Sequence, residues 1–233
     1  MMKKHKTVGV LGGYGPYATA DFYKLILDSN PAEKDWDHLH VIIDSNPKIP
    51  SRARAFLFNE ESPLKYMIEG VNRLKNAGAD VFVCPCNSAH YFLQQQEYFE
   101  IPFLDMTKVV VDRIIKSKKR KVGVIGSEVT VGGEIYDKPL SEKGIETIHV
   151  EDLSRVRKVI EYGKHNKELE VGKLILLELI EELKSKGAEG IIYACTELPI
   201  VLPSEEVDFL IFDTSKILAE SVIEIAKTQT HDK

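Results

Sequence analysis

Four short segments in the first half of the chain recur, in the same order, in the second half. The pairs are residues 6–12 and 121–126, residues 78–80 and 187–189, Cys86 and Cys195, and residues 103–108 and 210–216. Equivalent landmarks are separated by 108 to 114 residues, so their order and their spacing repeat together. Four landmarks at nearly one offset are hard to obtain by chance. We therefore expect two copies of one structural unit.

Each copy alternates apolar runs with amphipathic stretches. Runs that predict buried strands lie at residues 7–11, 39–43, 81–84, 101–105, 121–126 and 190–194. Helical periodicity marks residues 18–29, 64–78 and 214–227, residues 91–100 can also form a helix, and residues 44–53 predict a loop. Strands that alternate with helices indicate parallel sheets covered by helices on both faces.

The predicted fold class is α/β, with two pseudo-symmetric domains, each a mainly parallel sheet flanked by helices. We place the first domain at residues 1–115 plus 214–233 and the second at residues 116–213. The basic run at residues 116–121 is interpreted as a solvated turn between them. The helix at residues 214–227 has an apolar stripe that needs a partner surface, so we expect it to pack back on the first domain.

Composition excludes several classes of protein. The chain has 233 residues, of which 43% are hydrophobic, and this is typical of a packed globule rather than a disordered chain. A net charge of -5 gives no basic footprint for nucleic acid. No apolar run approaches the ~20 residues of a membrane span, and the basic start at residues 1–6 lacks the apolar core of a signal peptide. We expect a cytoplasmic protein whose thiols stay reduced.

Cys86 and Cys195 each end an apolar run and precede small polar residues. Ligands of parallel sheets bind outside the carboxyl ends of the strands, so the two thiols are expected to face one cleft between the domains. The start of a helix should also make such a thiol more acidic. Two thiols on opposite sides of a carbon can remove and return a proton with inversion of configuration. The alternative is that both are packing residues, and this is the preferred interpretation for Cys84, which has no counterpart.

The chain resembles the aspartate/glutamate racemase family in three motifs. These are Leu-Gly-Gly-Tyr-Gly-Pro-Tyr-Ala-Thr at residues 11–19, Cys-Asn-Ser-Ala-His at residues 86–90 and Cys-Thr-Glu-Leu-Pro at residues 195–199. The resemblance covers essentially the whole chain. It implies a cofactor-independent, usually dimeric amino-acid racemase with two pseudo-symmetric domains, in which Cys86 and Cys195 are the acid/base pair. The expected partner is a small amino-acid substrate, and we expect a homodimer.

The resemblance also implies residues that contact the substrate. Residues 46–52 match the loop whose arginine binds a substrate carboxylate, which implies Arg52, and residues 161–164 match the segment that implies Lys164. Positions that line the carboxylate and amino group are matched by Asn87, Ser88, Thr130 and Thr196.

Three residues depart from the usual family pattern. Tyr14 stands where methionine is usual, Ser88 where threonine is usual, and Glu128 where small or hydroxyl residues are common. We assign Tyr14 to the substrate pocket, where it can set the depth, and Glu128 can change the size or charge of that pocket. Glu197 is also assigned to substrate binding, although it can instead cap the following helix.

Other interpretations stay open from the sequence. Arg52 and Lys164 could be surface charges, and His90 could face solvent or the domain interface, or tune the thiol of Cys86 as an imidazolium. The glycines at residues 12–15 fit no dinucleotide or phosphate-loop pattern, and Cys84-Pro85-Cys86 has no second ligand pair for a metal. The rival functions are a broad-specificity amino-acid racemase, a related decarboxylase or isomerase, and a non-catalytic protein that binds a small ligand.

Overall fold

The computed structural model describes residues 5–227. Residues 1–4 of the basic start and residues 228–233 at the end of the predicted first domain lie outside the described residues. No helix within residues 5–227 is long and apolar enough to cross a membrane.

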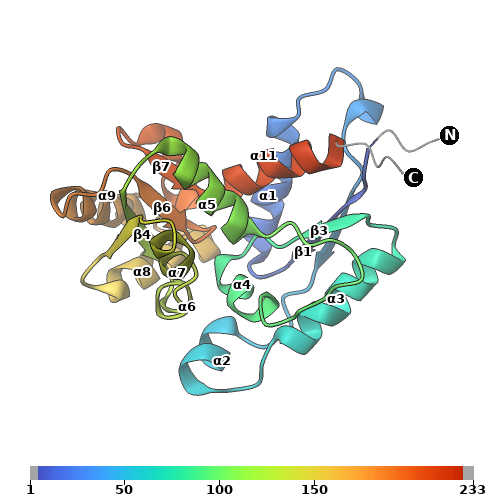
Figure 1. Ribbon diagram of the computed structural model, residues 1–233, viewed down its shortest axis with the longest axis horizontal. Coiled ribbons are helices and arrows are strands. Elements are labelled where there is room, and N and C mark those ends of the chain that lie inside the picture. The colour runs from blue at the N-terminus through green and yellow to red at the C-terminus, as the bar shows by residue number, and fades with distance from the viewer. Residues whose placement is uncertain (1–4, 228–233) are drawn as a thin grey trace.

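Two parallel β-sheets form the two halves of the molecule (Figure 1). The first sheet has the order β2-β1-β3, and its strands are β1 (Val8–Gly12), β2 (Val41–Ser45) and β3 (Val81–Val83). The second has the order β5-β4-β6-β7, with β4 (Lys121–Gly126), β5 (Glu146–His149), β6 (Ile191–Ala194) and β7 (Ile211–Asp213). Every strand pair is parallel. The predicted fold class is confirmed.

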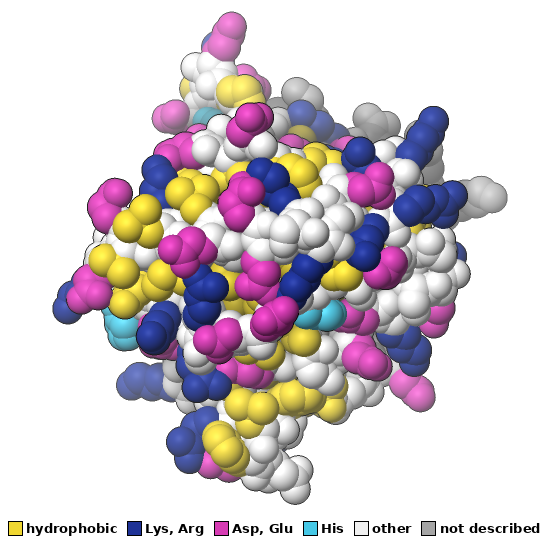
Figure 2. Space-filling view, turned by 90° about the vertical axis from the view of Figure 1, so that its left-hand side faces the viewer, with side chains coloured by type: hydrophobic (Ala, Val, Ile, Leu, Met, Phe, Trp, Pro, Cys, Tyr) yellow, Lys and Arg dark blue, Asp and Glu magenta, His cyan; other side chains and the backbone are white. Residues whose placement is uncertain are grey.

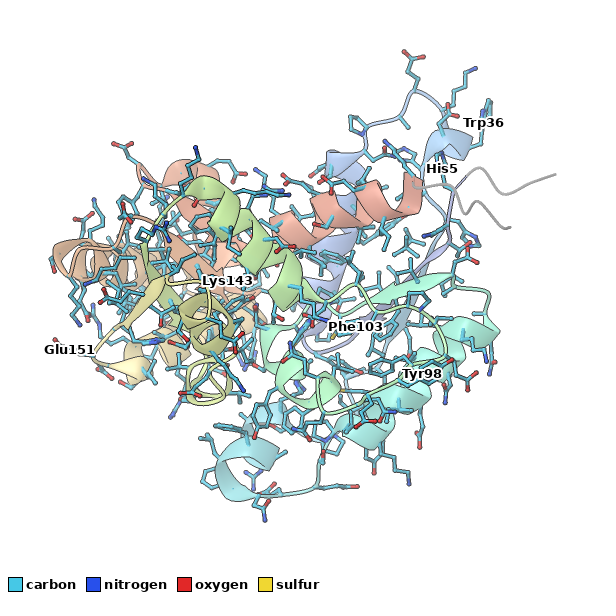
Figure 3. The ribbon with its side chains drawn as sticks, viewed as in Figure 1. His5, Trp36, Tyr98, Phe103, Lys143 and Glu151 are labelled. Atoms are coloured by element: carbon cyan, nitrogen blue, oxygen red, sulfur yellow. The ribbon has the colours of Figure 1, made fainter. Side chains whose placement is uncertain are left out.

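Helices cover both sheets. Those of the first half are α1 (Pro16–Ser29), α2 (Arg52–Phe58), α3 (Leu64–Asn76), α4 (Asn87–Leu93) and α5 (Met106–Ser117), with the 3-10 turn η1 (Asp35–Asp37). Those of the second half are α6 (Glu128–Gly132), α7 (Asp137–Ser141), α8 (Leu153–His165), α9 (Leu169–Ser185), α10 (Leu198–Val201) and α11 (Thr214–Lys227), with the 3-10 turn η2 (Ser204–Glu206). In Figure 1, α2 projects from the lower edge of the molecule, and Trp36 of η1 projects from the upper right in Figure 3.

Alternate residues of each central strand contribute to different parts of the core. Val8 and Val10 of β1 pack in one apolar cluster, whereas Leu11 packs in another with α3. In the second sheet, Val122 and Val124 of β4 lie in the same cluster as Val8, whereas Ile125 packs with α8 and α9. This period of two follows from the alternation of side chains along a strand. One face of each sheet therefore has its own core, and the other face contributes to a core that the two halves share.

The shared core is completed by α5 and α11, which pack against each other. As predicted, α11 follows the last strand of the second sheet and packs on α1 of the first half, and the Lys6 N–H donates to Ala226 O at 3.0 Å. On this basis we propose that the boundaries at residues 115 and 213 separate the two units.

Three local predictions are wrong. Residues 101–105 form a single parallel bridge between Phe103 and Phe82 rather than a strand, and Pro102 has no N–H for a longer ladder. The helix expected at residues 91–100 instead starts directly after Cys86 and ends at Leu93. The loop expected at residues 44–53 already turns into α2 at Arg52, where the Ser51 hydroxyl accepts from the Arg54 N–H at 3.3 Å.

Candidate active site

One cavity of about 300 Å³ is lined by residues from both halves of the chain. Four of its lining segments follow the carboxyl ends of the central strands: Tyr14 comes after β1, Cys86 after β3, Ser127 after β4 and Cys195 after β6. This is the edge at which open parallel sheets bind ligands. A turn at Gly13 makes room there, because its φ is 91° and a Cβ would lie 2.5 Å from the backbone of Asn46. Both cysteines lie in this cleft, which is the location that the sequence predicted for the site.

Cys86 is the N-cap residue of α4 and is buried. Burial raises the pKa of its thiol, the positive charge of Arg52 opposes this rise, and the negative charge of Glu197 adds to it. The expectation that the helix start would make the thiol more acidic than a free cysteine is therefore wrong in sign. Removal from water outweighs the charge of Arg52 and the hydrogen bond from the backbone N–H of Ala89.

His90 holds the cysteine loop in place. The side chain is fully buried, its Nε2 accepts from the Met106 N–H at 3.1 Å, and its Nδ1 donates to Cys86 O at 2.9 Å. Burial lowers the pKa of His90, so the ring is neutral. Its face also stacks on Phe103, which Figure 3 labels near the middle of the molecule, at a centroid distance of 5.4 Å. The ideas that His90 faces solvent or acts as an imidazolium are both wrong.

Cys195 has an acidic neighbour instead of a basic one. Its Sγ donates to Glu197 Oε2 at 2.9 Å, and the Thr196 hydroxyl donates to the same oxygen at 3.3 Å. Burial and the Glu197 carboxylate together hold the pKa of the thiol well above its usual value. Glu197 is the N-cap residue of α10, but its side chain makes no capping bond, so the capping interpretation is wrong.

Arg52 reaches the cavity from the first turn of α2. Its Nη2 donates a hydrogen bond to Tyr14 O at 2.9 Å, and the guanidinium carbon lies 5.2 Å from the centre of the Tyr14 ring. Its Nε is buried without a hydrogen-bond partner in the described structure. Tyr14 itself is buried and lines the cavity, as predicted.

Lys164 also lines the cavity, but it is already paired. Its Nζ donates to Glu161 Oε1 at 2.8 Å, one helical turn away on α8. The helix lies close to the Cys195 loop, because a Cβ at Gly163 would come within 2.8 Å of the backbone oxygen of Glu197. Lys164 is thus placed at the site but bonded to a neighbouring acid.

A chain of hydroxyl groups joins the two halves beside the thiols. Ser88 Oγ lies 3.0 Å from Ser127 Oγ, which lies 3.1 Å from Thr130 Oγ1. Thr130 is buried, does not line the cavity, and donates to Ala194 O at 3.4 Å. The structure therefore gives Thr130 a supporting position behind Ser127 rather than the predicted position on the substrate.

Asn87 lines the cavity with a side chain that is already engaged. Its Nδ2 donates to the Thr214 hydroxyl at 3.0 Å, and its Oδ1 accepts from the Tyr136 hydroxyl. Both partners lie in the second half of the chain, so the side-chain amide ties the Cys86 loop to that half.

Several other residues line the cavity, although the sequence predicted no individual role at the site for any of them. They are Ser51, Ala53, Leu57, Phe58, Ser127, Val129, Arg157, Ile160 and Glu161. Ser127 could have been found, because it follows β4 as Tyr14 follows β1. Arg157 carries no sequence signal. Its Nε donates to Glu128 Oε1 at 2.6 Å, and this pair connects α8 to α6.

The cavity thus combines two thiols from opposite halves with one cation, Arg52, that has no acidic partner among the described residues. Both thiols line this one cavity. Cys84 is separate from them, fully buried in the core of the first sheet, as predicted. Within residues 5–227, no group of three or more His, Cys, Asp or Glu residues could hold a metal ion.

Comparison with known proteins agrees with this geometry. The Asp/Glu/Hydantoin racemase family model matches residues 11–222. The chain is 32% identical over 222 residues to a broad-specificity amino-acid racemase of Bacillus subtilis (strain 168), which covers 93% of this chain and 96% of that relative. It is 26% identical over 196 residues to a glutamate racemase of Aquifex aeolicus (strain VF5), covering 81% and 74% of the two chains.

A solved structure, the aspartate racemase of Picrophilus torridus, superposes with a TM-score of 0.87 at 28% identity, covering 94% of this chain and 93% of that one. The resemblance inferred from three sequence motifs is confirmed. Because the family model spans most of the sequence, and the Bacillus relative is matched over nearly its whole length, the chain belongs to the Asp/Glu/Hydantoin racemase family.

Proposed function

We propose that this protein racemises an amino acid without a cofactor, by transferring protons between the α-carbon and two cysteines. The observation that carries the proposal is that Cys86 and Cys195, which follow β3 and β6, line one cavity from opposite halves of the chain. Inversion needs a base on one face of the carbon and an acid on the other.

The surroundings of the two thiols suggest their resting roles. Arg52 favours the thiolate of Cys86, and Glu197 favours the protonated thiol of Cys195. In one direction the Cys86 thiolate takes the α-proton, and the electron pair of the C–H bond passes into the carboxylate. Cys195 then gives its proton to the opposite face of the carbon. The reverse direction needs the complementary protonation state.

The carbanion needs its carboxylate stabilised. The start of α4 offers backbone N–H groups, and Ser88 and Ser127 offer hydroxyl groups beside them.

We propose an acidic amino acid, aspartate or glutamate, as the substrate. A second carboxylate needs its own cation, because its desolvation would otherwise oppose binding. Arg52 is the candidate, since its guanidinium has an unpartnered Nε and no acidic partner among the described residues. Its planar fork can grip a carboxylate with two parallel hydrogen bonds.

A broader substrate range is the second candidate. It is favoured by the pairing of the other two cavity cations, Lys164 with Glu161 and Arg157 with Glu128. A decarboxylase would need only one thiol of the pair, and a binding protein would need neither.

The test is turnover of single enantiomers. The protein, in buffer with chelator and without added cofactor, is incubated with L-aspartate, L-glutamate or L-alanine, and the products are resolved by chiral chromatography. We expect the D-enantiomer of an acidic amino acid to form at the highest kcat/KM. Absence of any D-product would reject the racemase proposal, and equal turnover of alanine would select the broader candidate.

A further inference from the structure

The charges around the cavity cancel. The described lining residues include three cationic side chains, Arg52, Arg157 and Lys164, and three acidic ones, Glu128, Glu161 and Glu197. A cavity of zero formal charge matches a zwitterionic amino acid, whose own charges also cancel. The net charge of the cavity therefore gives no preference for a second carboxylate, so the preference proposed above comes from Arg52, which has no acidic partner among the described residues.

The Glu128–Arg157 ion pair differs from the other charged groups of the cavity because it joins two different helices. Glu128 and Arg157 come from different elements, α6 and α8, whereas Glu161 and Lys164 are neighbours on one helix. Arg157 directs both Nε and Nη2 to the same oxygen, Oε1 of Glu128. The other oxygen, Oε2, has no hydrogen-bond partner among the described residues. Glu128 is also the less exposed partner, with 19% of its side chain accessible against 61% for Arg157.

Each member of this pair offers a ligand group of opposite charge. The cavity that they line also has apolar lining residues, including Leu57, Phe58 and Ile160. Glu128 can accept from a cationic side chain through Oε2. Arg157 has further N–H donors that Glu128 does not use, but the Glu128 carboxylate already neutralises its charge.

We propose that the Glu128–Arg157 ion pair determines which substrate side chains the cavity accepts. It does so because its two opposite charges keep the part of the cavity that they line neutral. The proposal rests on the proposed racemase function and concerns the class of substrate that the same cavity accepts. The pair suppresses the preference for dicarboxylic substrates that a free Arg157 would create, and it admits neutral side chains.

Replacing either member of the Glu128–Arg157 pair should change the substrate specificity, and the two changes should be in opposite directions. Glu128→Gln keeps the shape but leaves Arg157 unpaired, so kcat/KM for glutamate relative to alanine should rise about tenfold, or about 1.4 kcal/mol. Arg157→Gln leaves Glu128 unpaired, so the same ratio should fall and the ratio for lysine relative to alanine should rise. The double variant restores zero charge and should return both ratios close to those of the wild type.

Two controls separate charge from structural damage. Arg155 pairs with Glu178 between α8 and α9, away from the cavity lining, so Glu178→Gln removes a similar ion pair and should leave both ratios unchanged. The shifts should also shrink at about 1 M salt, where the screening length is only ~3 Å. Ratios that stay within about twofold of the wild type in both single variants would overturn the proposal.

The racemase proposal and the specificity proposal fail in different ways. Dissociation constants for glutamate, alanine and lysine, measured by calorimetry on the wild type and the same variants, do not require turnover. If no substrate is racemised but the binding ratios shift as expected, the racemase proposal is wrong and the role of the pair stands. If turnover is normal and neither set of ratios moves, the role of the pair is wrong and racemisation stands.

Discussion

The Cys86 and Cys195 sides of the cavity use the same strand-end position and surround it with opposite charges. Cys86 lies near Arg52, and its loop is held by the neutral ring of His90. Cys195 donates to the carboxylate of Glu197, and its loop is held by the close approach of α8 at Gly163. The backbone frame is repeated, whereas the neighbouring side chains are not.

This difference teaches that pseudo-symmetry of the fold need not make the two thiols equivalent. Burial raises the pKa of both, but a nearby cation limits the rise for Cys86 and a nearby carboxylate extends it for Cys195. The two sides should therefore lose their protons at different pH values. The charges beside the two thiols therefore favour the state with a thiolate at Cys86 and a protonated thiol at Cys195.

Removing either thiol should have the largest effect. Cys86→Ala and Cys195→Ala should each lower racemisation in both directions by about a thousandfold or more, because the proton can no longer be exchanged on one face. The measurement is kcat for each enantiomer of the best substrate. Cys84→Ala is the matched control, since Cys84 is buried outside the cavity, and it should keep most of the activity. A single-thiol variant of the pair with near-normal rates in both directions would refute the two-base mechanism.

Replacing Arg52 should weaken the Cys86 side. Arg52→Ala should cost about 2–4 kcal/mol in kcat/KM for a dicarboxylic substrate, the range for losing one partner of a buried charged pair. Without the positive charge the pKa of Cys86 rises further, so the acid limb of the pH–rate profile should move to higher pH. Arg52→Lys keeps the charge and should restore the limb but not the full affinity, since the planar fork is lost. Equal losses for alanine and aspartate would contradict the assignment of Arg52 to the second carboxylate.

Neutralising Glu197 should make the two sides more alike. Glu197→Gln removes the negative charge that favours the protonated thiol, so the pKa of Cys195 should fall. Because Cys195 must keep its proton to act as the acid, the alkaline limb of the pH–rate profile should move to lower pH. The rate of Cys195 alkylation, followed by mass spectrometry at several pH values, checks the same shift. An unchanged alkaline limb and alkylation profile would show that Glu197 does not set this pKa.

Replacing His90 should have the smallest effect on the chemistry and a measurable one on stability. His90→Gln should lower the free energy of unfolding by about 1–3 kcal/mol, because two buried hydrogen bonds lose their geometry. The lowered pKa means that unfolding takes up a proton. The contribution of His90 to stability is thus complete above about pH 6.5 and declines as the pH falls below it.

Urea unfolding at pH 7.5 and pH 5.5 measures this contribution. The wild type should lose more stability between the two pH values than His90→Gln does, although Asp105, 3.7 Å from the ring, offsets part of the effect. An equal loss in both proteins would contradict the role of a buried neutral ring.

The sequence by itself determined the α/β class, the two sheets and the positions of both cysteines, because these depend on local patterns. Apolar residues recur with the period of a strand or a helix. The strand ends at Cys86 and Cys195 can therefore be recognised from the sequence alone. It also predicted the packing of α11 on the first half, since an unpartnered apolar stripe must be buried somewhere.

Only the tertiary structure decided the charges of the site. The acidity expected for Cys86 from its helix start was reversed by burial, which depends on everything packed around it. The structure places Thr130 behind Ser127, and it pairs both Lys164 and Arg157 with glutamate side chains. Arg157 and Glu128 are 29 positions apart in the sequence and meet only when α6 and α8 pack together. Backbone patterns are local and repeat, but pKa values and ion pairs depend on which side chains the fold brings together.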